Sequence, residues 1–433
     1  MGTTPLWATL SAAMLLVSAN PAGAQGNRLT LNDAVRSALA TSSSLRGAEA
    51  KVEGARARID EASSHQYPTV SVGLTPLHLG ILDPSLNAML NSFAPGLSPN
   101  MLSEMLTVSQ VLYDGGRSQL GRQAAETGTE MAAQGVKLTR QNVAFDVANS
   151  YLTVLRTESL LQTTVLAQRQ AEQHLKDAQL REQAGAGSHF DTLQAQTAVA
   201  LVQGRLIQAR NAVRLSRISL ATAIHQPVAD RSLDPNPALP VVAVDLAGLE
   251  RGLEQRPEVE IAKRQSRVDA LTTEISARDR LPVAAVQGIV LGQGTSIPAY
   301  VVMGSLNWTL YDGGKTEAKV KQGEMSTAAD EASLTSLREG LRLEIEKAIA
   351  DRDEAKERIA AAEQGLKTAQ AGFDLANLRY TEGAGTGSEV IDATSALSQA
   401  QAGYVQATYD EYGAELRLAK ALGVDLASQL SGL

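Results

Sequence analysis

Tyr113-Asp114-Gly115-Gly116-Arg117 returns later in the chain as Tyr311-Asp312-Gly313-Gly314-Lys315, at an offset of 311 − 113 = 198 residues. A second pair of matching stretches, Leu180–Gly187 and Leu378–Gly385, has the same offset, since 383 − 185 = 198. Two unrelated short matches rarely share one register. The sequence therefore predicts an internal duplication, with a rigid element of fixed length between the two marks of each copy.

The segment between the two marks reads as one long helix in each copy. From Gly116 to Ala184 there are 184 − 116 + 1 = 69 residues without proline, and 314–382 is equally free of it. A continuous helix of this length spans about 100 Å. Apolar residues recur at spacings of three, four and seven, which indicates a coiled-coil-like stripe that needs antiparallel partner helices: Val143, Val147, Tyr151, Val154, Leu161 and Val165.

Each long helix is followed by a glycine-containing turn. The turns at 185–188 and 383–388 combine glycines suited to a helix C-terminus with hydroxyl residues suited to a helix N-cap. We therefore expect the chain to reverse there and to return as a second helix, which ends near Gln226 in the first copy and near Leu422 in the second. Asp191 and Glu389 fall in the first turn of these returning helices, where a negative charge suits the helix dipole.

A shorter helix and two strands precede each long helix. We expect helices over 31–66 and 246–280, ended by Pro68 and Pro282. The proline offset is 282 − 68 = 214, so the first copy has 214 − 198 = 16 extra residues, which fall in the Pro-, Asn-, Ser- and Leu-rich stretch 77–100. Apolar and polar residues then alternate, which predicts strands with one apolar face; the clearest stretches are 70–74, 106–112, 283–291 and 301–310, with Leu306, Trp308 and Leu310 on one face. A membrane barrel and an ordinary half-buried hairpin both give this pattern.

Composition excludes several classes of function. The net charge is −8 and there is no cysteine, so nucleic-acid binding, disulfides, thiol catalysis and thiolate metal sites are not expected. The five histidines lack metal-ligand spacing, no nucleophile–base pair stands out, and Thr309 stands where a phosphate-binding loop would need glycine. We therefore predict neither an enzyme nor a cofactor.

The domain organisation follows from these marks. Residues 1–24 read as a secretory signal peptide, because the apolar run Leu6–Val17 precedes the small-residue cleavage pattern Ala22-Gly23-Ala24. Met1 to Pro5 departs from the usual signal because it carries no Lys or Arg. We expect a first structural repeat over 25–228, a connector over 229–245 and a second repeat over 246–433.

These features together resemble the TolC-like outer-membrane efflux protein family. The shared marks cover nearly all the mature chain: the opening Leu29-Thr30-Leu31, the Tyr67-Pro68 before the first strand, the two YDGG motifs and the two glycine-containing tips. The resemblance implies a fold that is mainly α with a transmembrane β-barrel portion: a homotrimer in which each chain gives four strands to a twelve-stranded barrel, and long antiparallel coiled-coil helices to an α-helical barrel. Four strands cannot close a barrel and an open sheet edge cannot face lipid, which independently requires oligomerisation if the strands lie in a membrane.

The resemblance also implies location and role. The chain is expected in the cell outer membrane with its helical part in the periplasm, as the exit duct of a tripartite efflux or type I secretion system. Its expected partners are outer-membrane lipid, a periplasmic adaptor protein and an inner-membrane transporter. The alternative is a soluble periplasmic or secreted coiled-coil scaffold without a pore. The sequence leaves open whether drugs, metals or proteins are exported.

Site residues are carried over by position from the family. Glu389 and Asp392 fall on the constricting acidic positions of the tunnel tip, and Tyr380 is expected to bond Asp191 in the closed state. The family has an arginine two residues after the position of Gly383, the tip glycine of the second repeat, where this chain has Gly385. The glycines are assigned to two roles, although helix capping alone would account for those at the tips: adaptor contact for Gly185, Gly187, Gly383 and Gly385, and the strand–helix junctions for Gly115, Gly116, Gly313 and Gly314.

Overall fold

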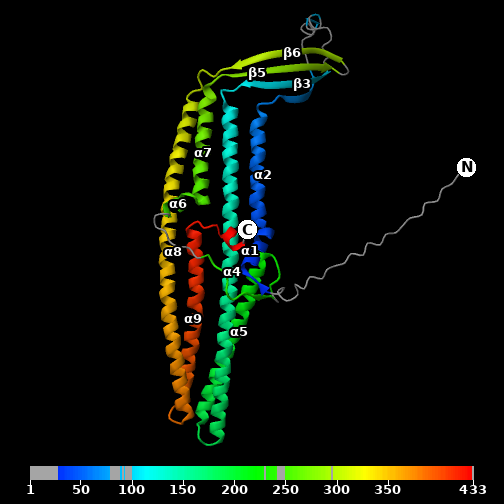
Figure 1. Cartoon of the computed structure of the whole chain (residues 1–433). Coiled ribbons are helices and arrows are strands. Elements are labelled where there is room, and N and C mark those ends of the chain that lie inside the picture. The colour runs from blue at the N-terminus through cyan, green and yellow to red at the C-terminus, as the bar shows by residue number, and fades with distance from the viewer. Residues whose placement is uncertain are drawn as a thin grey trace, which may run out of the picture.

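The computed structural model describes residues 28–78, 88, 89, 92, 100–228, 231–240, 249–293 and 296–431. The predicted signal peptide, most of the 77–100 loop and part of the predicted connector lie outside these residues. Within them, the chain forms an elongated helical rod with a β-sheet at one end (Figure 1). At the other end lie the turns of two helical hairpins.

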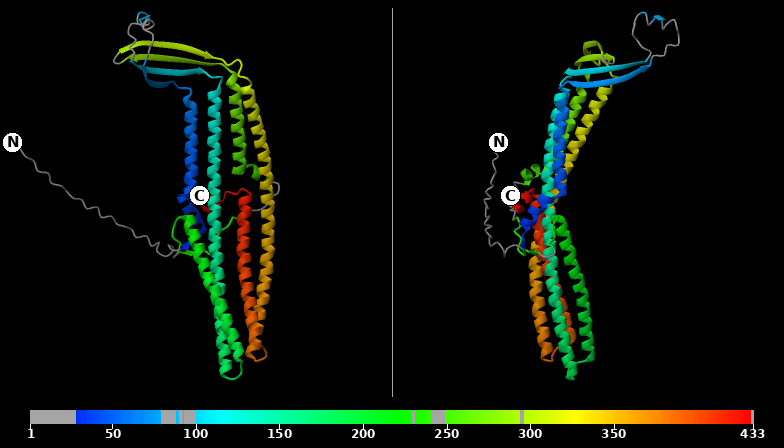
Figure 2. Two further views of the ribbon diagram at one scale, coloured as in Figure 1. Left: turned by 180° about the vertical axis from the view of Figure 1, so that it is seen from behind. Right: turned by 90° about the vertical axis from the view of Figure 1, so that its right-hand side faces the viewer.

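Two helices of equal length run the whole way from the sheet to the turns (Figures 1 and 2). These are α4 (Arg117–Gln183) and α8 (Lys315–Thr381), each of 67 residues, which confirms the predicted long elements. Shorter antiparallel helices pack beside their upper and lower halves: α2 (Ser43–Ser64) and α5 (His189–Ile224) along α4, and α7 (Pro257–Ala277) and α9 (Gly387–Ala421) along α8. None of the described helices combines the length and apolarity needed to cross a membrane.

The first predicted helix is not continuous. It divides at Ser42 into α1 (Leu31–Thr41) and α2, and the Ser42 hydroxyl accepts a hydrogen bond from the Leu45 N–H at 3.2 Å. Serine side chains compete with the helical backbone in this way, so the Ser42-Ser43-Ser44 run starts a new helix.

The corresponding helix of the second repeat is divided too. Its described part begins as α6 (Leu249–Glu254), restarts at Pro257 as α7, and ends in the 3-10 turn η1 (Arg278–Arg280). Proline suits the first helical position and forces the residue before it into an extended conformation. The prediction of one uninterrupted helix over 31–66 and another over 246–280 was therefore wrong, because each is divided in the structure.

The four long strands form one antiparallel sheet in the order β2-β3-β5-β6. They are β2 (Thr69–His78), β3 (Asn100–Tyr113), β5 (Val283–Gln293) and β6 (Ser296–Asn307). Pairing of β3 with β5 joins the two repeats, and β2 and β6 are left at the edges. The strand predicted over 301–310 ends early, at Asn307, because its partner β5 begins at Val283, directly after Pro282. Trp308 instead donates its indole N–H to the Arg280 carbonyl at 3.0 Å.

One face of this sheet is apolar and exposed. Val70 lies opposite Val108, and Val302 lies opposite Gly288, so the four strands present one continuous surface. The side chains of Val70 and Val302 are 65% and 70% exposed. In a water-soluble protein, other parts of the molecule would cover such an apolar surface. This face therefore indicates contact with lipid or with another apolar partner.

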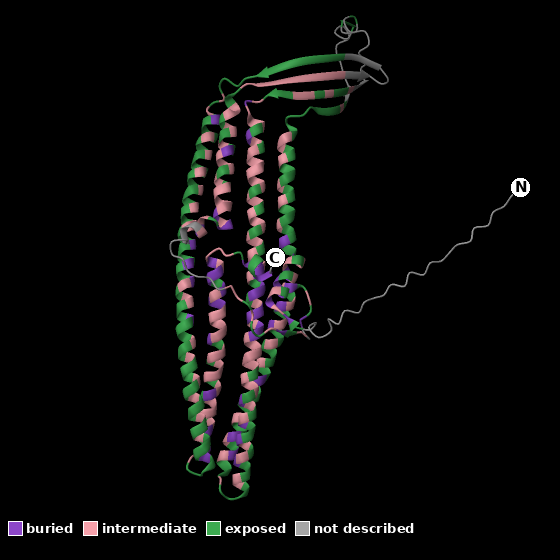
Figure 3. Ribbon diagram, viewed as in Figure 1, coloured by how far each residue is buried: buried purple, intermediate pink, exposed green. Residues whose placement is uncertain are grey.

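The main core lies at mid-height, where buried residues concentrate (Figure 3). Here α1, α4, α5, α9 and the C-terminal α10 (Leu426–Ser431) pack around a two-residue parallel pair, β1 (Arg28–Leu29) with β4 (Ser232–Leu233). Tyr151 of α4 is fully buried; its hydroxyl donates to the Leu29 carbonyl at 2.8 Å and accepts from the Asp234 N–H at 2.7 Å. Tyr151 therefore ties both small strands to the long helix.

Replacing Tyr151 with phenylalanine is expected to destabilise the protein by about 1–3 kcal/mol, because it leaves a buried N–H and a buried carbonyl without their partner. Denaturation of the detergent-purified protein measures this. Tyr404→Phe on α9 is the control, because the Tyr404 hydroxyl makes no hydrogen bond among the described residues. A Tyr151→Phe protein as stable as the control would contradict the assigned role.

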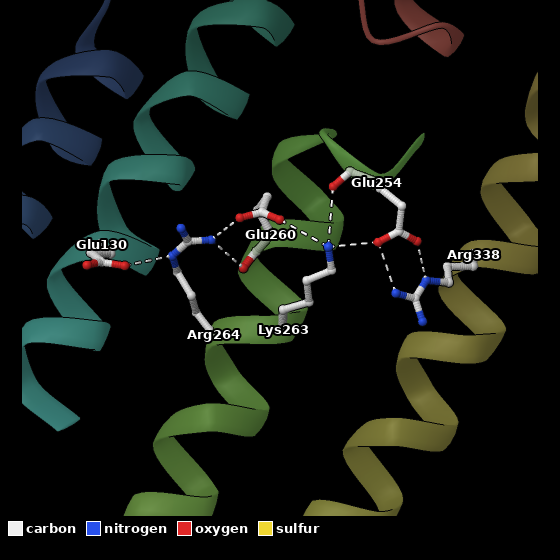
Figure 4. Close-up of polar contacts among 6 residues, drawn as sticks. All are labelled: Glu130, Glu254, Glu260, Lys263, Arg264 and Arg338. Atoms are coloured by element: carbon white, nitrogen blue, oxygen red, sulfur yellow. Dashed lines mark hydrogen bonds and ion pairs between the residues drawn. The ribbon is translucent and has the colours of Figure 1, made fainter. Parts of the chain in front are cut away.

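A chain of ion pairs fastens the upper helices together (Figure 4). The Glu254 carboxylate of α6 accepts two hydrogen bonds from the Arg338 guanidinium of α8, at 2.7 and 3.0 Å. It also forms an ion pair with the Lys263 ammonium of α7 at 2.7 Å. Through Glu260 the network continues to Arg264, which reaches Glu130 of α4 at 3.2 Å (Figure 4). Hydrogen bonds from Arg338 and Lys263 lower the pKa of Glu254 to about 2. Glu254, Lys263 and Arg338 are more than a third exposed, so solvent screens their ion pairs, which fix helix register more than they add stability.

Candidate functional site

The YDGG motif forms the junction between strand and long helix in both repeats. Asp114 accepts hydrogen bonds from the Gly116 and Ser118 N–H groups at 2.8 and 2.7 Å. Asp312 repeats this geometry with Gly314 and Thr316, at 3.1 and 2.9 Å. The aspartate thus satisfies backbone donors that the first helical turn leaves free. Partial burial raises the pKa of Asp114, but the hydrogen bonds from Ser118 and Gly116 lower it further than burial raises it.

The paired glycines of each motif are required by conformation. Gly115, Gly116, Gly313 and Gly314 all have positive φ, between 69° and 86°. A Cβ at Gly115 would lie 2.8 Å from Leu281 of the second repeat, whereas nothing lies within 4 Å of a Cβ at Gly313. The first junction is therefore packed against the second repeat, and the second junction has no such neighbour among the described residues.

The two tips share one design. Gly185 and Gly383 follow the long helices with φ of +70° and +76°, and Ala186 and Ala384 bond back to the carbonyls of Arg181 and Arg379 at 2.9 and 2.8 Å. The returning helix α5 starts with a capping box in which Ser188 and Asp191 bond each other's backbone, and α9 starts at the N-cap Thr386. The turns are thus where the sequence predicted them.

The four tip glycines differ in surroundings. A Cβ at Gly187 or Gly385 would lie 2.9 or 3.1 Å from the Cβ of Arg181 or Arg379, so these glycines let the turn fold back on its own helix. Nothing lies within 4 Å of a Cβ at Gly185 or Gly383. Of these four glycines, Gly185 and Gly383 therefore have free space on the side where a Cβ would point.

The predicted gate carboxylates occupy different environments. Glu389 is half-exposed and pairs with Arg379 of its own hairpin at 3.7 Å. Asp392 is exposed. Asp191 of the first tip lies against the start of α9, since a Cβ at Gly387 would be 3.6 Å from its carboxylate. Two tips that are far apart in sequence thus meet at Asp191 and Gly387.

A second link between the tips was not predicted. The Arg181 guanidinium lies over the Tyr380 ring at 4.1 Å and donates to the Thr381 carbonyl at 3.0 Å. The His174 ring contacts the same tyrosine, with ring centroids 5.2 Å apart. Arg181 and His174 come from α4, whereas Tyr380 and Thr381 end α8, so these contacts join the two hairpins. The one sequence signal was that Arg181 lies inside the repeated stretch.

Tyr380 is buried, and burial raises its pKa. No hydrogen bond joins Tyr380 to Asp191 in the described part of this single protomer, so that bond stays a prediction for the closed state. Burial lowers the pKa of His174, while Asp177 and Asp191 oppose this shift and Arg181 adds to it. The described residues contain no group of three or more His, Cys, Asp or Glu side chains placed to hold a metal ion.

The described chain is thus a rod of long antiparallel helices that ends in a four-stranded sheet with an exposed apolar face. A sequence model of the outer membrane efflux protein family matches residues 34–225 and 250–424, and the chain belongs to this family. This confirms the family resemblance seen in the motifs.

Known relatives agree with this assignment. The chain is 26% identical over 428 residues to the pyoverdine export outer membrane protein OpmQ of Pseudomonas aeruginosa, covering 93% of this chain and 87% of that protein. It is 25% identical over 406 residues to protein CyaE of Bordetella pertussis, covering 90% and 82%.

Solved structures show the same fold. Crystal structures of CusC match with a TM-score of 0.79 at 18% identity, over 91% of this chain and 92% of that one. VceC of Vibrio cholerae matches with a TM-score of 0.76 at 19% identity, over 91% and 96%. The protein is an outer-membrane channel of the efflux and secretion class, with its helical part in the periplasm, and the alternative of a pore-free scaffold is set aside.

Proposed function

We propose that three copies of this chain close a twelve-stranded barrel and form the exit duct of a tripartite efflux or type I secretion system, gated at the periplasmic helix tips. The observation that carries this proposal is the four-stranded sheet, which has an exposed apolar face and two edge strands, β2 and β6. An open edge cannot lie in lipid, so β6 of one protomer is expected to pair with β2 of the next.

The internal repeat predicts the register of that pairing. Within the chain β3 pairs with β5 so that Val108 lies opposite Gly288. If the same geometry recurs between protomers, adding the repeat offset gives 108 + 198 = 306, and subtracting the proline offset gives 288 − 214 = 74. Leu306 of one protomer is therefore expected to lie opposite Leu74 of the next.

Cysteine cross-linking tests this register, because the chain has no cysteine of its own. The double variant Leu306→Cys with Leu74→Cys is expected to give disulfide-linked dimers and trimers on oxidation, since directly opposed residues place their Cβ atoms about 4.5–5.5 Å apart. Non-reducing gel electrophoresis of outer membranes reads the result.

The matched control places the second cysteine on an interior strand. Leu306→Cys with Val108→Cys uses the same face of the sheet, but Val108 already lies between β2 and β5. It is expected to give monomer only. Monomer from the Leu74 pair as well would contradict the pairing and the proposed barrel.

We further propose that Glu389, Asp392 and Asp191 line the constriction at the tips. Three copies of these carboxylates around one axis attract cations and repel anions. They also repel one another, so a closed tip needs opposing contacts such as that of Arg379 with Glu389.

Replacing Glu389 and Asp392 with alanine is expected to lower the cation selectivity of the reconstituted channel, measured as the reversal potential in a salt gradient across a planar bilayer. The control is Glu363→Ala with Asp374→Ala, which removes the same charge from exposed positions of α8. Equal reversal potentials in the two double variants would contradict the constriction.

The open backbones at Gly185 and Gly383 support adaptor docking at the tips, with an inner-membrane transporter beyond it. Contact of the apolar sheet face with outer-membrane lipid belongs to the same proposal. Transport through such a duct needs no catalytic group, and the proposal assigns the protein no enzymatic activity.

A further inference from the structure

The four-stranded sheet has a second face, opposite to the one that indicates contact with lipid. Successive side chains of a strand point to opposite faces, so the second face carries the residues that alternate with Val108 on β3 and with Val302 on β6. On β6 the two faces differ in exposure. Val302 is 70% exposed, whereas its neighbours Val301 and Met303 are each 42% exposed. The second face is therefore the more enclosed side of this strand, as expected for the inside of a curved sheet.

In the proposed trimer the second face lines the lumen of the barrel. A barrel of eight strands is just filled by its own side chains, and the diameter grows with the number of strands. Twelve strands therefore leave open space along the axis, which neither lipid nor side chains from across the lumen occupy. The second face is expected to meet only the contents of the duct, which are water and the exported molecules.

Three apolar side chains of the second repeat lie together on this face. Ile289 of β5 lies directly opposite Val301 of β6, and Met303 is the next residue of β6 on the same face. The interior of a transmembrane barrel is ordinarily polar, and apolar side chains gathered on a water-facing surface mark an interaction site. Methionine is flexible and polarisable, which suits contact with apolar groups of different shapes. Ile289, Val301 and Met303 are called the lumenal belt below.

The first repeat places hydroxyl groups beside the lumenal belt. Thr107 of β3 lies opposite Ile289, and Ser71 of β2 lies opposite Thr107. One step along the strands, the hydroxyls of Thr69 and Ser109 share a hydrogen bond of 2.6 Å. The lipid face is apolar in both repeats, so the repeats have diverged on the lumen face. An apolar strip on β5 and β6 thus lies next to a hydrogen-bonding strip on β2 and β3.

The lumen face has no charged side chain where its side chains are described, over 69–73, 105–111, 283–289 and 301–307. Rings of charged side chains select solutes by their charge, and this wall offers none. The property that it can distinguish is apolar surface, because contact with the belt removes such surface from water. A solute with one apolar side and one hydrogen-bonding side matches both strips.

We infer that the lumenal belt and the adjacent hydroxyls form a subsite for amphiphilic organic molecules in transit through the barrel. The apolar part of such a molecule lies on Ile289, Val301 and Met303, and its hydrogen-bonding groups meet Thr107 and Ser71. Three copies around the axis give three subsites. The inference rests on the proposed barrel and names a class of cargo that its wall retains, whatever the state of the tips.

Protection of an introduced cysteine tests the subsite, because the chain has no cysteine of its own. Val301→Cys places a thiol in the belt of the detergent-purified full chain, and mass spectrometry follows its alkylation by iodoacetamide. Tetraphenylphosphonium is the apolar probe, and tetraethylammonium has equal charge with much less apolar surface. At about five times its dissociation constant, tetraphenylphosphonium is expected to slow alkylation about sixfold, because only unoccupied sites react. Tetraethylammonium is expected to leave the rate unchanged.

Two further single cysteines locate the effect. Asn307→Cys is on the same face as Val301, 307 − 301 = 6 residues along β6, which is about 20 Å. Neither probe is expected to change its alkylation. Val302→Cys faces lipid, where the reactive thiolate is disfavoured, so it is expected to stay unmodified. A reactive Val302→Cys with an unreactive Val301→Cys would contradict the assignment of the lumen face and the proposed barrel with it.

Variants of the wall test the chemistry of the subsite in the Val301→Cys background. Ile289→Thr with Met303→Gln keeps side chains of similar size but removes apolar surface, and is expected to weaken tetraphenylphosphonium about tenfold or more. Thr107→Val adds apolar surface beside the belt and is expected to strengthen it. Equal protection by both probes, or none by tetraphenylphosphonium, would overturn the subsite and leave the barrel standing. Unreactive cysteines at both 301 and 302 would show that protein covers the belt, and would also overturn the subsite.

Discussion

Replacing Arg181 with alanine is expected to open the helix tips. The substitution removes a charge-assisted hydrogen bond to the Thr381 carbonyl and the stacking of the guanidinium on Tyr380. Such a hydrogen bond contributes about 1.5–3 kcal/mol and a cation–π contact about 0.5–2 kcal/mol. Since about 1.4 kcal/mol is a tenfold change in an equilibrium, the ratio of open to closed channels is expected to rise at least tenfold. Single-channel recording in planar bilayers measures it.

Two variants on the same helix sharpen this test. Arg169→Ala removes the same charge from an exposed position of α4 and is expected to leave the open probability unchanged. Arg181→Lys keeps the charge but loses the planar group that stacks on the ring, so an intermediate effect is expected. A closed channel in Arg181→Ala would show that this link does not hold the tips.

Tyr380→Phe separates the observed link from the predicted one. Phenylalanine keeps the ring beneath Arg181 but removes the hydroxyl that was expected to bond Asp191. If the guanidinium–ring contact dominates, this variant stays closed. If Tyr380→Phe opens as readily as Arg181→Ala, the Tyr380–Asp191 bond is the closing contact and the stacking is secondary.

The repeat made the long-range architecture predictable, because two equal offsets require two rods of equal length. The repeat could not predict the side-chain contacts at the tips, because equivalent residues of the two repeats have different neighbours there. Arg181 and Arg379 are related by the offset, yet Arg379 pairs with Glu389 of its own hairpin while Arg181 reaches across to Tyr380. The counterpart of Tyr380 in the first repeat is Glu182, which instead bonds His189 at 2.7 Å. The contacts at the tips differ between the repeats because equivalent residues have different neighbours in the folded chain. The spacing of residues in the sequence does not reveal these neighbours.

The local errors have a common cause. Helical periodicity continues through Ser42, but the Ser42 hydroxyl accepts a hydrogen bond from the Leu45 N–H, so α1 ends and α2 begins there. Alternation continues through Trp308 and Leu310, but no partner strand extends that far. Periodicity describes which face a residue takes within an element, whereas capping and pairing decide where the element stops.

Replacing Gly323 with leucine is expected to separate α7 from α8. A Cβ at Gly323 would lie 2.8 Å from both Cβ and Cγ2 of Thr273, closer than real contacts allow, so α7 must move. Overpacking of this kind costs about 1–3 kcal/mol or more, against a gain of about 1 kcal/mol from replacing a helical glycine. Movement of α7 also disturbs Arg278, which donates to the Gly115 carbonyl at 2.9 Å and supports the first strand–helix junction.

Gly340→Leu supplies the matched comparison on the same helix, because nothing lies within 4 Å of a Cβ there. It retains the propensity gain without the clash, so it is expected to stabilise the protein by about 0.5–1 kcal/mol. Thermal unfolding of the detergent-purified protein therefore gives shifts of opposite sign from one chemical change at two positions of α8. Upward shifts in both variants would show that α7 yields at little cost, and that the close approach at Gly323 is not what aligns the helix with the junction above it.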